Sequence, residues 1–202
     1  MAGFADCMPD PAILARARRG DMKAHEVLYA SYGAPVYTLA VRILADPVLA
    51  EEVLQDTCIE VIRHVAEFRN DAAFGGWVKR IATNKALAYL RSAWHRKSGR
   101  LAPDDEALEL PAGGSFHRDD PATRIADQES LARALHALSP TARAVVWLYD
   151  VEGYSHQEIA ALMGKTTSFS KSRLSRAHEQ LRAQLGPDYE EVSACMPRPN
   201  SC

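Results

Sequence analysis

Apolar side chains recur along this chain every three or four residues, the spacing of one face of an α-helix. The cleanest stripe follows Asp46-Pro47, a pair that suits the N-cap and the first position of a helix. Its members are Leu49, Val53, Leu54, Cys58, Val61, Ile62 and Val65. β-Branched residues are scattered and strand signals are weak. The pattern therefore predicts an all-α fold.

The same spacing predicts the other helices of the first half. A short helix runs from Pro11 to Arg19, and Asp21 then caps a longer helix in which Pro35 is a candidate kink. The stripe of that helix is Leu28, Tyr32, Val36, Leu39 and Ile43. A further long helix spans about Phe74 to Arg96, with candidate core residues Trp77, Val78, Ile81, Ala82 and Leu90. We place a first small helical domain at residues 10–97.

A change of composition separates this domain from a second one. Residues 98–124 contain six Gly or Pro residues and six acids, without apolar periodicity, which predicts a flexible acidic linker. The second small helical domain is placed at residues 125–185. Its first helix carries the stripe Leu131, Leu135 and Leu138, and a second starts at Ser139-Pro140, carries Ala144, Val145 and Leu148, and ends at Gly153. Residues 186–202 form a tail without helical pattern.

The strongest local motif lies in the second domain. Ser155 and Glu158 form a capping box for a short helix that Gly164 ends, and Thr166 or Thr167 caps the basic helix that follows. Two helices joined by a glycine turn, the second rich in donors, are typical of a helix-turn-helix. The candidate donors of the second helix are Ser168, Lys171, Arg173, Ser172, Ser175 and Arg176. The alternative is an exposed basic helix in an ordinary bundle.

The formal net charge of −2 results from segments of opposite sign. Residues 72–103 contain seven Lys or Arg and no acid, with Trp77, Tyr89 and Trp94 interleaved. Cations attract a phosphate backbone and aromatic rings hold unstacked bases, so this run indicates nucleic-acid binding. The alternative is a solvated amphipathic helix with aromatic residues in the core, and for Trp77 alone we favour that reading.

An acidic segment lies close to this basic run. Residues 46–60 contain five acids and no Lys or Arg. The acids Glu51, Glu52, Asp56 and Glu60 lie on the face opposite the apolar stripe. Because this face cannot serve the same ligand as the basic run, we expect it to bind an electropositive protein.

Other function classes find little support. No nucleotide-binding, zinc-protease or hydrolase motif occurs, and the histidines lack metal-ligand spacing, so no enzyme activity, cofactor or metal is expected. Cys195 and Cys202 in the tail could form a metal or redox sensor, but two thiols do not complete a zinc site, and we favour a tail without that function. The apolar run Pro35–Val41 is too short to span a membrane, and the first twenty residues lack a signal core, so we expect a cytoplasmic protein without membrane insertion.

Two blocks of the chain resemble the sigma-70 family of bacterial RNA polymerase sigma factors, in its small extracytoplasmic-function (ECF) subgroup. Residues 46–97 are similar to sigma region 2, through Glu51-Glu52-Val53-Leu54-Gln55-Asp56-Thr57 and through Trp77-Val78, Ile81-Ala82-Thr83-Asn84 and Tyr89-Leu90-Arg91. Residues 138–185 are similar to region 4, through Glu152-Gly153-Tyr154-Ser155 and Lys171-Ser172-Arg173-Leu174.

The resemblance implies a sigma factor that binds core RNA polymerase and directs initiation at promoters, with no catalysis of its own. It implies that the β′ coiled coil of the polymerase binds Glu51, Glu52, Gln55 and Asp56. It assigns recognition and melting of the promoter −10 element to Phe68, Asn70, Lys79, Arg80, Asn84 and Arg91. It assigns the −35 element to Tyr154, Thr167, Ser168, Phe169, Lys171, Ser172, Arg173, Ser175 and Arg176. Region 4 would also bind the β flap, the linker would thread along the polymerase, and an anti-sigma protein is a plausible partner by family.

The chain departs from the family pattern in the recognition helix. Ser170 stands where a buried Val is usual, and the bulky Phe169 takes a position that often contacts DNA. Ala88 also replaces a frequent acid. The resemblance therefore does not say which DNA sequence is read. Two other hypotheses stay open at this point: a helix-turn-helix regulator that acts without polymerase, and a helical adaptor that sequesters another regulator.

Overall fold

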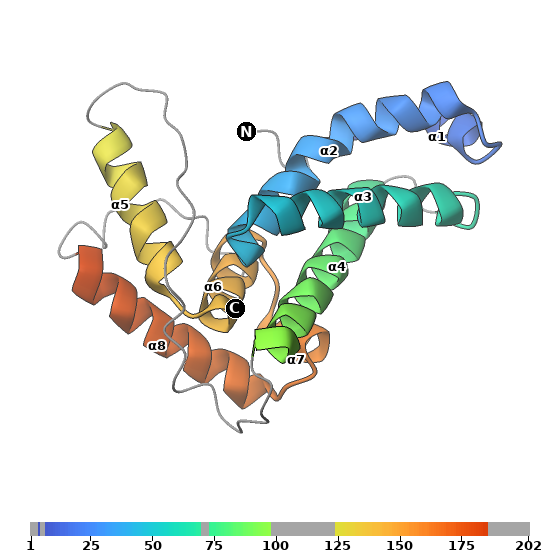
Figure 1. Cartoon of the computed structure of the whole chain (residues 1–202). Coiled ribbons are helices and arrows are strands. Elements are labelled where there is room, and N and C mark those ends of the chain that lie inside the picture. The colour runs from blue at the N-terminus through green and yellow to red at the C-terminus, as the bar shows by residue number, and fades with distance from the viewer. Residues whose placement is uncertain (1–3, 5–6, 70–72, 98–123, 186–202) are drawn as a thin grey trace. The chain divides into compact units, whose positions relative to one another are not determined.

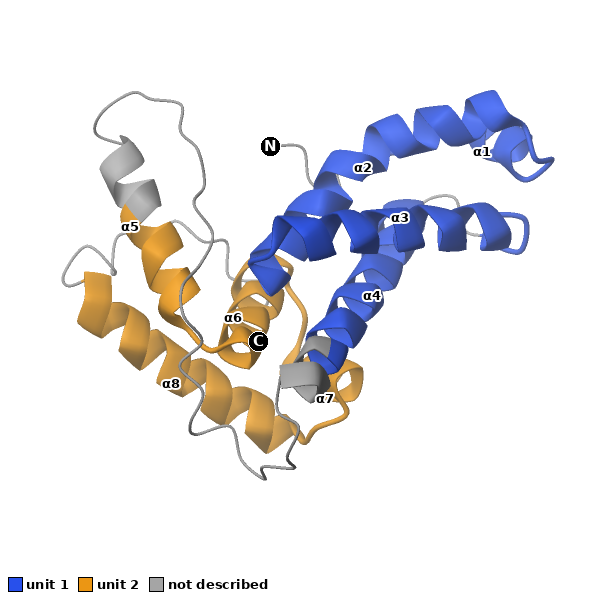
Figure 2. Ribbon diagram, viewed as in Figure 1, with its two compact units in different colours: residues 1–97 blue, residues 98–202 orange. Residues whose placement is uncertain are grey.

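The computed structural model describes residues 4, 7–69, 73–97 and 124–185. All regular elements in these ranges are helices, as Figure 1 shows, so the all-α prediction is confirmed. The chain forms two compact units, residues 1–97 and 98–202 (Figure 2). The predicted linker up to residue 123 and the tail with Cys195 and Cys202 lie outside the described residues. Arg124, which we counted with the linker, is the first residue of a helix.

Unit 1 is built around one long helix. Its elements are α1 (Pro11–Ala17), α2 (Met22–Leu44), α3 (Pro47–His64) and α4 (Phe74–Lys97). Helix α2 packs against the other three, and α3 packs against α4. The predicted stripe of α2 is entirely buried: Leu28, Tyr32, Val36, Leu39 and Ile43. Among the described helices, α2 alone is long and apolar enough to cross a membrane by length and composition, and half of its most apolar window is buried inside the structure.

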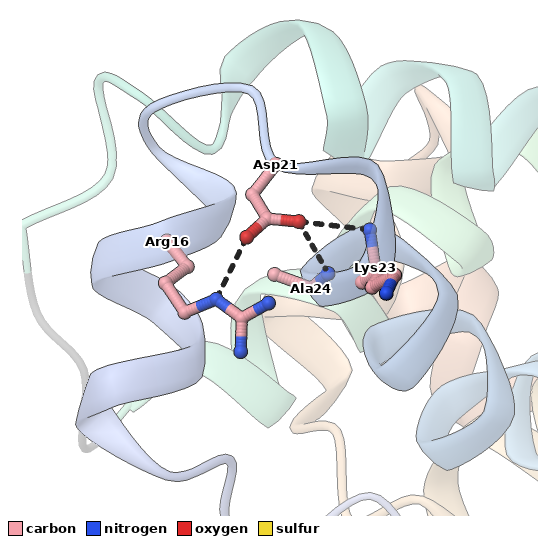
Figure 3. A network of polar contacts seen from close by, with 4 residues as sticks. All are labelled: Arg16, Asp21, Lys23 and Ala24. Carbon is pink, nitrogen blue, oxygen red and sulfur yellow. Dashed lines mark hydrogen bonds and ion pairs between the residues drawn. The ribbon is translucent and has the colours of Figure 1, made fainter.

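The starts of these helices follow the predicted capping chemistry. Asp46 accepts hydrogen bonds from the backbone N–H groups of Val48 and Leu49, and Pro47 is the first residue of α3. Asp21 caps α2 in the same way, through the N–H groups of Lys23 and Ala24. Figure 3 shows that its second carboxylate oxygen accepts a hydrogen bond from Arg16 Nε at 2.7 Å. The Asp21 carboxylate therefore joins the end of α1 to the start of α2.

The predicted stripe of α3 is wrong at one position. Ile62 is 47% exposed, and Leu49, Leu54 and Cys58 are only half-buried. The buried face is Ala50, Val53, Thr57, Val61 and Val65. Because α2 and α4 both pack against α3, the buried face is rotated relative to the predicted stripe and includes the small residues Ala50 and Thr57.

An aromatic cluster forms where α4 begins. Phe74 is fully buried, and its ring meets the edge of Tyr32 on α2 and of Phe68, each at 5.5 Å between centroids. Phe68 stacks on Trp77 at 4.8 Å. Of the predicted α4 core residues, Val78 and Ala82 are buried, whereas Trp77, Ile81 and Leu90 are half-buried. The favoured reading of Trp77 as a packing residue agrees with this cluster.

Unit 2 contains the helices of the second half. They are α5 (Arg124–Ala137), α6 (Pro140–Val146), η2 (Trp147–Val151), α7 (His156–Met163) and α8 (Thr167–Leu185). Helix α8 packs against α5, α6 and α7. The predicted core residues Leu135, Leu138, Ala144, Val145 and Leu148 are buried, whereas Leu131 is only half-buried.

The helix expected to run from Pro140 to Gly153 changes its type on the way. Its α-helical part ends at Val146, and residues Trp147–Val151 form a π-helix, with the N–H of Glu152 bonded to the carbonyl of Trp147. Single π turns are frequent at functional sites. Here the turn carries Tyr149 against His156 and Asp150 against His178.

We expect Asp21 to stabilise unit 1 through both of its roles. Asn keeps the N-cap but not the ion pair with Arg16, and Ala loses both, so the thermal midpoint should fall from wild type to Asp21→Asn to Asp21→Ala at pH 7. The hydrogen bond from Arg16 is the main cause that lowers the pKa of Asp21 below its ordinary 3.8. This stabilisation is complete above that value and is lost as the pH falls through the lowered pKa.

Circular dichroism at several pH values measures both effects. The difference in thermal midpoint between wild type and Asp21→Asn should decrease at acid pH. A difference independent of pH would show that the ion pair with Arg16 contributes nothing to stability.

Candidate functional site

The acidic face that the sequence predicts on α3 is only partly exposed. Glu51, Glu52 and Gln55 are exposed, while Asp56 is half-buried. Val48, Ile59 and Ile62 are also exposed, at 67%, 45% and 47%. Val48, Glu52, Gln55, Ile59 and Ile62 follow one another at steps of three and four residues, so they share one line of the helix surface. We call this line, together with the neighbouring exposed Glu51, the outer face of α3; it combines two acids with apolar side chains.

The other acids of α3 are engaged with α4. Tyr89 Oη donates a hydrogen bond to Asp56 Oδ2 at 3.2 Å, and Lys85 Nζ lies 3.4 Å from Glu60 Oε2. Each contact joins the acidic helix to the basic one. The Lys85–Glu60 ion pair thus neutralises one cation of the basic run and one acid of the acidic face, which reduces the charge that either helix offers to a partner.

The predicted −10 residues divide into two groups. Arg80, Asn84 and Arg91 are exposed on α4, at steps that keep them on one face, and Lys79 is half-buried nearby. Phe68 instead packs in the aromatic cluster, and its carbonyl accepts hydrogen bonds from Arg18 Nε and Nη2 at 3.1 and 2.9 Å. Asn70 lies outside the described residues. The structure therefore brings together a cationic face on α4 and an aromatic cluster at its start.

The helix-turn-helix motif has the predicted local chemistry. The Ser155 N–H donates to Glu158 Oε2 at 2.8 Å, and the Glu158 N–H donates to Ser155 Oγ at 3.2 Å, which completes the capping box. Gly164 ends α7 in the left-handed conformation, with φ of 66°. Thr166 rather than Thr167 caps α8, because its hydroxyl accepts the N–H of Phe169. These contacts determine how α8 leaves the turn.

The polar side chains of α8 form one exposed stripe. Its members, Ser168, Lys171, Ser172, Ser175 and Arg176, are all exposed. Arg173, Thr167 and Tyr154 are half-buried beside or before it. The opposite face packs into unit 2 through Leu174, Ala177 and Leu181. This row of hydroxyls and cations lies in a stretch, residues 165–178, that contains no acid, so it can contact phosphates and base edges.

Phe169 lies between two cations at the start of this stripe. Its ring is half-buried, with Lys165 Nζ 5.5 Å and Arg173 Cζ 5.3 Å from the centroid. Such distances allow cation–π attraction, which holds both cations close to the first turn of α8. An apolar ring in this place suits contact with a thymine methyl group.

The unusual Ser170 is buried and paired. Its side chain is fully buried, and its Oγ lies 3.0 Å from Nδ1 of His156 on α7. The His156 ring stacks on Tyr149 at 4.4 Å between centroids. A second pair joins His178 Nε2 to Asp150 Oδ2 at 2.7 Å. Polar contacts thus link α8 to α7 and to η2. The Ser170 hydroxyl is paired with His156, whereas the Val that is usual at this position would make apolar contacts only.

Sequence reasoning missed these pairs. Residues 156 and 170, or 56 and 89, are too far apart in the chain for a periodicity to connect them. The only available signal was a polar Ser at a position expected to be buried, which implied a partner without identifying it. Among the described residues, no three His, Cys, Asp or Glu side chains gather as a metal site.

Family comparisons match both units. Residues 28–96 match the family model described as Sigma-70 region 2, and residues 128–181 match that described as Sigma-70, region 4. The RNA polymerase sigma factor CarQ of Myxococcus xanthus is 33% identical over 178 residues, which are 88% of this chain and 98% of that protein. The ECF RNA polymerase sigma-E factor of Escherichia coli K12 is 28% identical over 188 residues, covering 91% and 98%.

Solved structures are similar over most of the chain. CnrH, in complex with the cytosolic domain of CnrY, has a TM-score of 0.50 and 25% identity, covering 88% of this chain and 97% of that one. The sigma factor RpoE of Bartonella quintana, in complex with the anti-sigma factor NepR, has a TM-score of 0.52 and 21% identity, covering 81% and 97%. The second likeness supports the fold alone.

We expect His156 to make unit 2 sensitive to acid. Burial, followed by the charge of Lys171, lowers its pKa below the ordinary 6.5, although Asp150 acts in the opposite direction. The unfolded chain therefore binds the proton more readily, so the stability contributed by neutral His156 is complete above pH 6.5 and is lost as the pH falls below it. An NMR titration should give His156 a pKa below 6.5.

Thermal unfolding of wild type and variants tests whether His156 causes this acid sensitivity. Acidification from pH 7.5 to 5.5 should destabilise wild type more than His156→Gln; an equal change would mean that other groups cause the acid sensitivity. His64→Gln, in unit 1, is the matched control.

Proposed function

The chain belongs to the sigma-70 family of RNA polymerase sigma factors, in its ECF subgroup, and we propose a separate role for each exposed surface. As a sigma factor it binds core RNA polymerase and directs initiation at promoters. The observation that carries the proposal is the presence, in family order, of an acidic and apolar helix face in unit 1 and a basic recognition helix in unit 2.

The outer face of α3 is assigned to core polymerase. Glu51, Glu52 and Gln55 would meet the β′ coiled coil, together with Asp56 at the edge of the face. Exposed Val48, Ile59 and Ile62 support a protein partner, because protein interfaces combine apolar contact with charge complementarity. Residues 10–97 are accordingly proposed as region 2.

The face of α4 is assigned to the −10 element. Lys79, Arg80, Asn84 and Arg91 would contact the backbone and edges of the DNA, and Phe68 and Asn70 would act where strands separate. Aromatic side chains near a cationic surface suit unstacked bases.

Helix α8 is assigned to the −35 element. The exposed stripe, with Tyr154, Thr167, Phe169 and Arg173 beside it, would enter the major groove through its N-terminal half, as in other helix-turn-helix proteins. Residues 125–185 are proposed as region 4, which would also bind the β flap, and residues 98–124 as the connection along the polymerase.

Other roles follow from the family. The family is not known for enzymatic activity, and RNA synthesis would be carried out by the polymerase alone. The protein would act in the cytoplasm, where polymerase and promoter DNA meet. An anti-sigma protein is a further proposed partner, since the similar sigma factor RpoE was solved in complex with one.

The deciding experiment adds the purified protein to core polymerase and scores initiation on a promoter library. Initiation that depends on the protein is expected. DNA binding by the protein alone, without initiation, would favour a polymerase-independent regulator, and absence of salt-dependent DNA affinity would favour an adaptor.

Charge reversal tests the polymerase surface. Glu52→Lys should weaken binding to core polymerase about tenfold or more, because a like charge then faces an electropositive partner. Glu26→Lys makes the same change on an exposed position of α2 and is the matched control. Affinity is measured by competition for labelled core enzyme. Equal affinities of the two variants would refute the assignment.

A second pair of variants tests the recognition helix. Arg176→Ala should weaken −35-dependent binding of the holoenzyme about tenfold, within the range of ~1–3 kcal/mol for loss of a base-reading contact. Arg182→Ala, in the last turn of α8, lies beyond the N-terminal half and should have little effect. Binding is compared on promoters with and without the −35 element. A similar loss in both variants would indicate general electrostatics instead of base reading.

A further inference from the structure

Two described residues before α1, Phe4 and Cys7, pack against the helices of unit 1. Phe4 is only 9% exposed. The Tyr32 hydroxyl donates a hydrogen bond to the carbonyl of Cys7, and the Cys7 thiol donates to the carbonyl of Ser31 at 3.3 Å. Burial raises the pKa of Tyr32 to about 12, so the hydroxyl remains a donor even in moderately alkaline solution. The chain is therefore held to α2 by both side chains and backbone.

The same chain touches the first turn of α4. A Cβ atom added to Gly75 would lie 2.3 Å from the carbonyl oxygen of Phe4 and 3.3 Å from its carbonyl carbon. Real Cβ atoms essentially never come so close to a backbone oxygen, so the contact requires glycine. A Cβ added to the neighbouring Gly76 would meet nothing within 4 Å. Of these two glycines, only Gly75 is needed for packing.

This contact lies at the start of the aromatic cluster. Gly75 directly follows Phe74, whose ring meets those of Tyr32, Phe68 and Trp77 at 5.4–5.5 Å. A shift of the first turn of α4 would move Phe74 and Trp77, and with them Phe68, which stacks on Trp77. Phe4 and Cys7 lie before residue 28, where the region 2 match begins.

We propose that Phe4 and its backbone contact at Gly75 position the −10 surface. The contact holds the first turn of α4, and thereby the aromatic cluster and the face bearing Arg80, where melted promoter DNA is bound. This role rests on the proposed function of that surface. It makes the chain before α1 a positioning element of promoter opening, while core polymerase binding, assigned to the outer face of α3, is independent of it.

Two neighbouring glycines provide a matched test. Gly75→Ala forces Phe4 or α4 to move, whereas Gly76→Ala makes the same chemical change in the same helical turn with open space around it. Gly75→Ala holoenzyme should open promoters about tenfold less than wild type, because overpacking against the Phe4 carbonyl shifts the first turn of α4. Gly76→Ala should open them normally, and both should bind core polymerase like wild type. Permanganate reactivity at the −10 element measures opening.

A deletion distinguishes the positioning role of Phe4 from a distortion that the Gly75→Ala substitution itself could cause within α4. Removing residues 2–6 takes away Phe4 and should itself lower opening; in that background Gly75→Ala should cause no further loss, because the clash is gone. Equal opening by Gly75→Ala and Gly76→Ala, or the same loss from Gly75→Ala with and without residues 2–6, would overturn the proposal. Increased opening after the deletion would also overturn it. If the unaltered holoenzyme opens no promoter at all, the proposed function itself fails.

Discussion

Both proposed surfaces of unit 1 depend on the packing of α3 against α4. One helix is rich in acids and the other in cations, and the two pack together. Across this helix–helix interface Tyr89 contacts Asp56, and Lys85 contacts Glu60. The Lys85–Glu60 ion pair is still about one-third exposed, and a pair so accessible to water contributes little to stability, about 0–1 kcal/mol. The packing of the two helices sets their rotation and so decides which charges face outward, and the polar pairs lie where that packing brings the acidic and basic helices together.

Local capping chemistry was predictable from the sequence. Asp21, Asp46 and Ser155 each accept hydrogen bonds from groups two or three residues away, so the cap and its partners lie in one short stretch of sequence. Gly164 ends its helix for an equally local reason, its positive φ. The stripe of α2 was also correct, since neighbours surround that helix and bury a broad face.

Features that depend on distant neighbours were not predictable. The stripe of α3 failed at Ile62 because an amphipathic pattern does not say which edge of the stripe the neighbours cover. The π turn from Trp147 to Val151 has no sequence pattern of its own that we recognised. The pairing of Ser170 with His156 joins two helices, and the approach of Phe4 to Gly75 joins the chain before α1 to α4. For the first pair, the polar Ser at a position expected to be buried was visible in the sequence, but its partner was not.

The exposed faces of α3 and α8 differ in the way that their proposed partners require. The outer face of α3 offers Val48, Ile59 and Ile62 among its acids, and removing such side chains from water favours association with another protein. The stripe of α8 offers hydroxyls and cations, which stay hydrated until they meet phosphates or base edges. Net charge alone distinguishes neither face, because the charges of the whole chain nearly cancel. The distinction comes from the mixture on each helix: apolar groups with acids for a protein, and donors without acids for DNA.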